Sequence, residues 1–217
     1  MKQRTPILLF LFLCLIYRTN AQDSTDYLEF NDRRNVVHGV YLGLTTHYGE
    51  INNKSAYFTG IKIAYVANQQ FEVGLAVTGF YSEQDFFNTV NLRDEDLIGG
   101  YAGLHLEPIF FSKSRVNLSF PVLIGAGAVG YVGDNFDDDL DDDFDDADAL
   151  FVLEPGVNML FNVSRYLQLE AGFKYRFSNK IDVVSSDISR LNGFSAGLGI
   201  KVGIFNMGRN RYKKNVK

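Results

Sequence analysis

The residues with the most evident chemical potential are ten aspartates in DNFDDDLDDDFDDAD, the segment from Asp134 to Asp148. Carboxylate oxygens are good Ca²⁺ ligands, and an EF-hand loop supplies ligands from positions 1, 3, 5, 9 and 12. Here Asp142 stands at the sixth position, where that loop needs glycine, and the twelfth is aspartate instead of glutamate. We therefore predict a solvated loop of mutually repelling charges, with weak, delocalised Ca²⁺ or Mg²⁺ binding as the alternative. The positions laid on an EF-hand are Asp137, Asp139, Asp141, Asp145 and Asp148.

The three histidines, His38, His47 and His105, are the candidates for acid–base or nucleophilic catalysis. A histidine activates a serine when the two lie within hydrogen-bond reach. None of the three stands beside a serine in a motif that we recognise. We expect hydrogen-bonded structural histidines and no catalytic site.

Nine ionisable side chains, His105 among them, share the polar side of alternating segments. They could line a path for ions or protons. The structural alternative is a set of mutual ion pairs, because buried charges must be paired. We favour the structural interpretation. The set is Lys62, Glu72, His105, Glu107, Glu154, Glu170, Lys174, Arg176 and Lys201.

These side chains must be positioned by eight segments in which apolar residues alternate with polar or small ones. In LQLEAGFKYRF, for example, Leu169 and Phe173 alternate with Glu170 and Lys174. Such period-two alternation is typical of strands with one apolar face. We predict an all-β fold with strands near 40–48, 57–66, 71–81, 99–110, 116–131, 151–161, 167–177 and 193–205.

The connections between these strands alternate between long and short. An up-and-down meander produces this pattern when every second connection lies at the same end. The long ones are predicted at 49–56, 82–96, 133–149 and 178–192, and the short ones at 68–70, 112–115 and 164–166.

The side opposite the bulky apolar residues is rich in glycine, including Gly43, Gly103 and Gly199. Glycine on a wet outer surface weakens a strand, whereas in a narrow barrel lumen it leaves room for long neighbours. We therefore expect the apolar side to face outward into lipid. Aromatic residues favour a bilayer interface. Those near the strand ends are Tyr48, Tyr57, Phe71, Tyr81, Phe110, Phe111, Phe161, Tyr166 and Phe177.

The N-terminus has the features of a secretory signal peptide. Lys2 and Arg4 precede an apolar run from Ile7 to Tyr17, and small residues ending at Ala21 offer a cleavage site. The run is too short to span a bilayer, which takes roughly 20 residues. It also contains Cys14, the chain's one cysteine. We predict a signal peptide at 1–21, a periplasmic segment at 22–35, a barrel at 36–205 and a basic tail at 206–217.

The stretches LEPIFF, FPVLIGAGAVGY and GLGIKVGIF resemble sequences of the small eight-stranded outer-membrane β-barrel family, which includes OmpX and the OmpA membrane domain. The resemblance covers about residues 36–205 and implies an eight-stranded antiparallel up-and-down transmembrane β-barrel with short periplasmic turns and longer external loops. Such barrels commonly end at an aromatic residue, but here NMGRNRYKKNVK follows Phe205.

This interpretation predicts a porin-like, non-catalytic protein of the cell outer membrane, surrounded by lipid and monomeric. Its role would be structural or would lie in surface recognition through its extracellular loops. We expect no cofactor, no resident metal and no nucleic-acid partner, and the sequence names no extracellular partner. The alternatives are a soluble periplasmic lipocalin-like barrel that binds a hydrophobic ligand, a narrow channel, and a lipid-modifying outer-membrane enzyme.

One lumen contact can be predicted from strand register. A three-residue turn at Ser164–Tyr166 pairs Val163 with Leu167 and so places Glu154 opposite Arg176. Lys174 is then diagonal to the same carboxylate. We predict an ion pair between Glu154 and one of these two cations.

Overall fold

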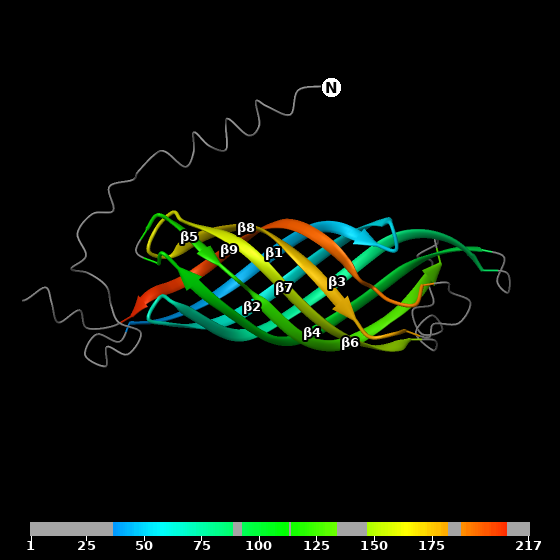
Figure 1. The fold of residues 1–217 in the computed structure, drawn as a ribbon, viewed down its shortest axis with the longest axis horizontal. Helices are drawn as coiled ribbons and strands as arrows, with labels where there is room; N and C mark the ends of the chain where they lie inside the picture. The colour runs from blue at the N-terminus through cyan, green and yellow to red at the C-terminus, as the bar shows by residue number, and fades with distance from the viewer. Residues whose placement is uncertain (1–36, 89–92, 113, 134–146, 182–187, 208–217) are drawn as a thin grey trace, which may run out of the picture. The chain divides into compact units, whose positions relative to one another are not determined.

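The computed structural model describes residues 37–88, 93–112, 114–133, 147–181 and 188–207. The predicted signal peptide, the 22–35 segment, most of the aspartate run and positions 208–217 of the predicted tail lie outside these ranges. Nine strands occur within them (Figure 1). They are β1 His38–Ile51, β2 Lys54–Ala67, β3 Phe71–Asn88, β4 Arg93–Phe110, β5 Val116–Ser119, β6 Val122–Gly133, β7 Asp148–Asn162, β8 Leu167–Ser178 and β9 Gly193–Met207.

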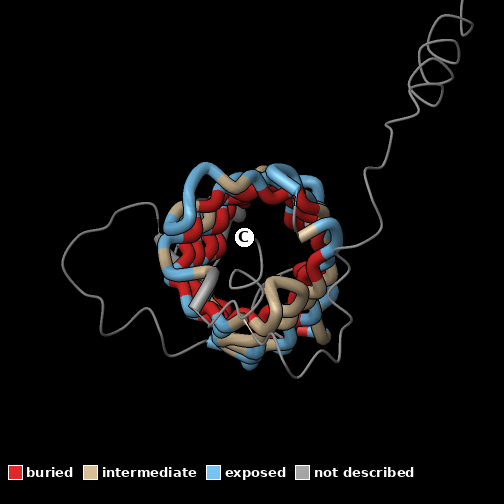
Figure 2. The backbone as a smooth tube through the Cα atoms, turned by 90° about the vertical axis from the view of Figure 1, so that its left-hand side faces the viewer, coloured by how far each residue is buried: buried red, intermediate tan, exposed pale blue. Residues whose placement is uncertain are grey.

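The strands form a closed antiparallel barrel of eight positions (Figures 1 and 2). Apart from β5 and β6, each strand pairs with the next along the chain, and β9 pairs with β1 from Met207 opposite His38 to Ser195 opposite Gly49. Strands β5 and β6 share one position, because both lie between β4 and β7. The predicted all-β, eight-stranded, up-and-down architecture is therefore confirmed.

The predicted single strand at 116–131 is interrupted at Phe120 and Pro121. Proline has no N–H to donate to a ladder. The register is nevertheless the same on both sides of the break, with Ser119 opposite Ile109 and Val122 opposite Leu106. The Phe120 N–H still donates to Pro108 O at 3.1 Å, and Pro121 O accepts from the Gly156 N–H at 2.8 Å, so the break does not displace the wall.

Two of the four long connections are shorter than predicted. The connection at 49–56 is a two-residue turn at Asn52 and Asn53, whose φ angles are 50° and 63°. Asparagine tolerates this left-handed region, and a turn with two such residues matches the twist of a hairpin. The connection at 82–96 is largely strand, since β3 and β4 stay paired out to Asn88 opposite Arg93, after a register shift beyond Ser82.

The remaining connections lie where they were predicted. Short turns join β2 to β3, β4 to β5 and β7 to β8 at one end, which we call the short-turn end. The β6–β7 and β8–β9 connections lie at the other end, the long-loop end. Three apolar residues of the β8–β9 connection, Ile181, Ile188 and Leu191, are buried in a cluster with strand residues such as Leu97 and Leu150. This cluster, which also includes Ile51 of β1 and which we call the apolar plug, packs across the barrel interior towards the long-loop end.

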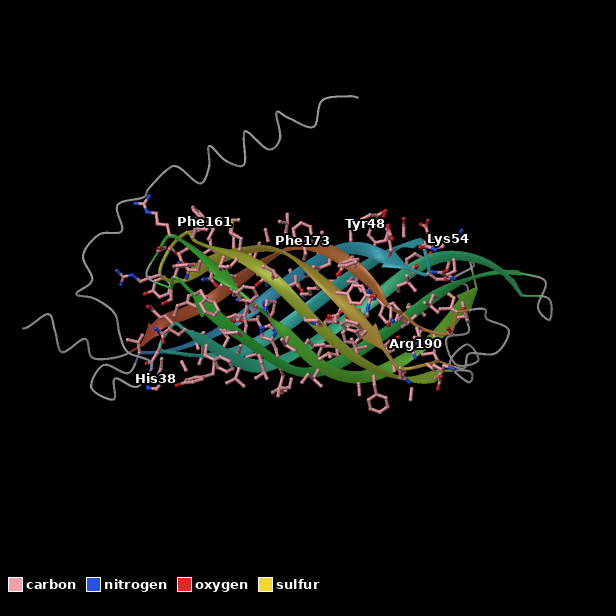
Figure 3. The ribbon with its side chains drawn as sticks, viewed as in Figure 1. His38, Tyr48, Lys54, Phe161, Phe173 and Arg190 are labelled. Atoms are coloured by element: carbon pink, nitrogen blue, oxygen red, sulfur yellow. The ribbon has the colours of Figure 1, made fainter. Side chains whose placement is uncertain are left out.

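The outer face of the barrel carries many exposed large apolar side chains. Leu104, Leu169 and Leu198, which were predicted to face outward, are exposed at 42%, 39% and 64%. Figure 3 shows Tyr48, Phe161 and Phe173 projecting from the wall. No helix in the described part of the chain is long and apolar enough to cross a bilayer.

Exposed aromatic side chains gather towards both ends of this face. At the long-loop end, Tyr48 contacts Tyr57 edge-on with ring centroids 5.2 Å apart. At the short-turn end, Phe110 contacts Phe120 in the same way at 5.5 Å. Aromatic rings at two levels separated by aliphatic residues are typical of a bilayer-spanning barrel.

Candidate functional site

The barrel interior brings the predicted polar set together. Alternation along β2, β3, β4, β7, β8 and β9 directs these side chains inward, and small residues make the space that they need. A Cβ on Gly43 would lie 2.8 Å from Lys62 Cγ, and one on Gly199 would lie 2.6 Å from Glu170 Cγ. Lys174 is half-buried. The buried members are Lys62, Glu72, His105, Glu107, Glu154, Glu170, Arg176 and Lys201.

Two lysines and three glutamates, which we call the lysine cluster, form the largest group: Lys62, Lys201, Glu72, Glu107 and Glu170. Lys201 Nζ lies 2.9 Å from Glu72 Oε2 and 3.0 Å from Glu107 Oε2. Lys62 Nζ lies 2.7 Å from Glu170 Oε2. The lysines come from β2 and β9 and the glutamates from β3, β4 and β8, so the cluster ties together five strands.

Hydroxyl groups complete this cluster. Tyr41 donates a hydrogen bond to Glu72, and Ser119 Oγ donates to Glu107 Oε1 at 2.5 Å. Neither residue was included in the predicted polar set, which was limited to ionisable groups with obvious charge. The signal was available, because Tyr41 alternates with the outward-facing Val40 and Leu42.

A second group joins Glu154 and Arg176. Arg176 Nε lies 3.5 Å from Glu154 Oε1, and Tyr101 donates a hydrogen bond to the same oxygen at 2.6 Å. The observed register has Leu153 opposite Phe177, as the three-residue turn requires. The predicted ion pair is thus confirmed, and Arg176 rather than Lys174 is the cation that makes it. The guanidinium carbon also lies 4.0 Å from the centroid of the Phe58 ring.

Within the predicted polar set, all of whose members are described, the charges balance. The four carboxylates of Glu72, Glu107, Glu154 and Glu170 are matched by four cations, those of Lys62, Lys174, Arg176 and Lys201. Burial of a charge is strongly unfavourable unless it is paired and hydrogen-bonded. The interior of an eight-stranded barrel is just wide enough for side chains to fill it, so charged side chains there must pair with one another.

One set of side chains has the composition of a metal site. Ligand atoms of Glu72, His105 and Glu107 lie within 4.8 Å of one another. The ammonium of Lys201, however, lies within 3.0 Å of both carboxylates and already supplies the positive charge. A metal ion coordinated by all three side chains would have to displace this buried lysine, so the three residues do not fit a metal ion.

The histidines do not form a catalytic arrangement with serine in the described residues. His38 is on the outer face, where it bonds to Tyr65, and His47 is buried in β1. His105 Nε2 lies 2.9 Å from Glu107 Oε2. Ser119 bonds to the other oxygen of that carboxylate, so the glutamate stands between serine and histidine. A hydrolytic triad needs the histidine in the middle to take the serine proton.

Positions 134–146 of the aspartate run lie outside the described residues. Only Asp148 is described, at the start of β7, where its Oδ1 accepts a hydrogen bond from the Ala149 N–H at 2.7 Å. Weak Ca²⁺ or Mg²⁺ binding by this loop stays a prediction.

Comparisons with known proteins agree with the fold. No family model and no curated protein matches the sequence. Among solved structures, Neisserial surface protein A is similar, with a TM-score of 0.55 and 12% identity over 76% of this chain and 96% of that one. A major outer membrane protein from Thermus thermophilus has a TM-score of 0.47 and 13% identity, over 78% and 99% of the two chains. Ail of Yersinia pestis has a TM-score of 0.41 and 16% identity, over 77% and 98%.

The closed antiparallel barrel and its likeness to Neisserial surface protein A show that the chain has the fold of the small eight-stranded outer-membrane β-barrels, as the sequence resemblance implied.

Proposed function

We propose that this protein is an integral outer-membrane barrel without catalytic activity, whose role is structural or lies in surface recognition. The observation that carries the proposal is the combination of a bulky apolar outer face with a neutral, ion-paired interior. A soluble lipocalin-like barrel would have the reverse arrangement, with its apolar side chains turned inward around a ligand. Likeness to Neisserial surface protein A supports the fold on which this proposal rests.

The packing of the interior favours a closed barrel over a channel. The apolar plug lies towards the long-loop end, and the lysine cluster crosses the lumen below it. Ile51, Leu150 and Leu191 of the plug have no exposed surface, and neither do Glu107 and Lys201 of the cluster. A path for ions would have to open both layers, at the expense of buried ion pairs.

Recognition of an external partner would use the long-loop end. Strands β3 and β4 each have 18 residues, which exceeds the roughly 9–11 needed to cross a bilayer. Together with the connections at 133–149 and 178–192, this hairpin would stand above the membrane. Loops held on a rigid scaffold are common sites of recognition.

An epitope-insertion experiment tests the orientation and the surface role together. A tag inserted between Asp141 and Asp142 should be reached by antibody on intact cells. The same tag in the β4–β5 turn, after Ser114, should be reached only when the outer membrane is permeabilised. Recovery of the protein in the soluble periplasmic fraction without detergent would contradict the proposal, and so would the opposite labelling pattern.

A further inference from the structure

A cavity of about 210 Å³ lies at the short-turn end of the barrel. Residues of all three short turns line it, among them Gln69, Ser112 and Ser164. Three buried polar side chains, Glu72, Asn117 and Gln168, also line it, with exposures of 1%, 4% and 5%. The cavity therefore joins the turn surface to the edge of the lysine cluster.

Two oxygen atoms in this cavity lack donors. Neither Glu72 Oε1 nor Gln168 Oε1 has a hydrogen-bond partner among the described residues. The orientation of the Gln168 amide is fixed, because its Nε2 donates to Asn162 Oδ1 at 2.7 Å. The other oxygen of Glu72 already accepts from Lys201 at 2.9 Å. A buried acceptor without a donor is unfavourable, so each of these oxygens favours a donor supplied from outside the chain.

Three apolar side chains line the cavity beside its polar turn residues. Val66 and Ile109 are buried there, and Phe205 also lines it. A ligand that satisfied the two oxygens would place its other end against these three side chains. Two protein oxygens are too few for Ca²⁺, which takes six to eight oxygen ligands. A primary ammonium, with three N–H donors and a positive charge, suits one carboxylate and one amide oxygen.

We propose that this cavity binds a small primary alkylammonium compound, with its ammonium group between Glu72 and Gln168 and its alkyl group against Val66, Ile109 and Phe205. Lys201 shows the same chemistry inside the barrel, since its ammonium lies on the other oxygen of Glu72. Arg165 also lines the cavity, but it is exposed, and its guanidinium lies 5.9 Å from the centroid of the Tyr166 ring. Its charge therefore stays at the rim. This binding role is separate from the proposed surface role at the opposite end.

The test uses n-butylammonium chloride as the probe and n-butanol as its neutral analogue. The chain without residues 1–21 is folded into uncharged maltoside micelles, and binding is followed through the side-chain amide signals of Gln168 by NMR and through calorimetry. We expect saturable binding of butylammonium and not of butanol. Gln168→Leu, which removes the free oxygen, should weaken binding about tenfold, as loss of a charge-assisted hydrogen bond does. Gln168→Glu, which adds a carboxylate of the same size, should strengthen it.

Gln84→Leu is the matched control. Gln84 is also buried, but it lies at the long-loop end, where it bonds to Ile51 O and Ser82 Oγ. This variant should bind butylammonium as the unchanged protein does. Binding of butanol equal to that of butylammonium would overturn the proposal, as would no saturable binding or equal weakening in Gln84→Leu. If Gln168→Leu does not fold, the direction of the change in Gln168→Glu decides, and no gain in affinity overturns the proposal.

Discussion

Replacing Leu104 by arginine places a charge on the outer face at the middle of the barrel. Leu104 is 42% exposed, and its cross-strand neighbours Leu75 and Ile124 are 62% and 53% exposed. It lies six residues from Phe110, the aromatic residue at the end of β4. At about 3.4 Å per residue and a tilt of about 45°, this separation is about 14 Å along the barrel axis.

That depth sets the magnitude of the expected effect. The apolar band of an outer-membrane barrel is about 25 Å tall, so a residue about 14 Å from one edge lies near the bilayer midplane. Arginine there should lower the free energy of unfolding by about 2–4 kcal/mol. Equilibrium unfolding in denaturant, with the protein folded into phosphatidylcholine vesicles, measures this change.

Val116→Arg is the control for depth. Val116 is 46% exposed and pairs with Phe161 at the short-turn end, near the interface. The same chemical change should cost only about 0–1 kcal/mol at that depth. Equally small decreases in the free energy of unfolding at both positions would refute the reasoning. On a face in water, the effect of an introduced arginine would not depend on its position along the barrel axis.

Three further changes probe the interior and the acidic loop. Glu154→Gln should lower the free energy of unfolding by about 3 kcal/mol, because Arg176 is left buried without its carboxylate, and denaturant titration measures it. Gly199→Ala should cost about 1–3 kcal/mol in the same titration, since its Cβ would lie 2.6 Å from the Glu170 side chain. Deletion of 136–147 should leave the barrel folded with a thermal midpoint close to that of the full chain, because loop-closure entropy changes slowly with length.

Each of these changes has its own control. Glu154→Gln combined with Arg176→Met should recover part of the lost stability, and no recovery would argue against the pair. Gly79→Ala should be nearly neutral, because a Cβ there would meet only Gly99 O at 4.0 Å. For the deletion, the control is Ca²⁺. Stabilisation of the full chain by micromolar Ca²⁺ that is lost on deletion would make the aspartates a metal site by mass action.

The wall of the barrel could be predicted because alternation determines which side chains share a face. A strand shift by one residue would turn every apolar residue inward, so the pattern also fixes the register of Glu154 and Arg176. The same parity places Tyr41 and Tyr101 inside. They were left out because the predicted polar set was limited to charged groups, although alternation alone was sufficient to place both tyrosines inside.

The connections were harder to predict, because polar composition does not distinguish a loop from a strand that extends into water. The β3–β4 hairpin continues past Ser82 to the pair Asn88 and Arg93, where the sequence has no period-two apolar pattern to indicate a strand. Asn52 and Asn53 did carry a local signal, as a pair of residues that tolerate positive φ. The inward packing of Ile181 and Leu191 could not be predicted, because apolar residues in a loop do not show whether the loop folds into the barrel or away from it.

The account depends most on the apolar face being in contact with lipid. The chain contains no tryptophan, so a single introduced tryptophan reports on its own surroundings. Leu198→Trp would report from the outer face and Phe58→Trp from the lumen, where the wild-type residues are 64% and 3% exposed. In vesicles of lipid brominated at mid-chain, the account predicts strong quenching of Leu198→Trp and little quenching of Phe58→Trp. Strong quenching at position 58 with none at 198, or water-like emission from position 198 without quenching, would contradict it.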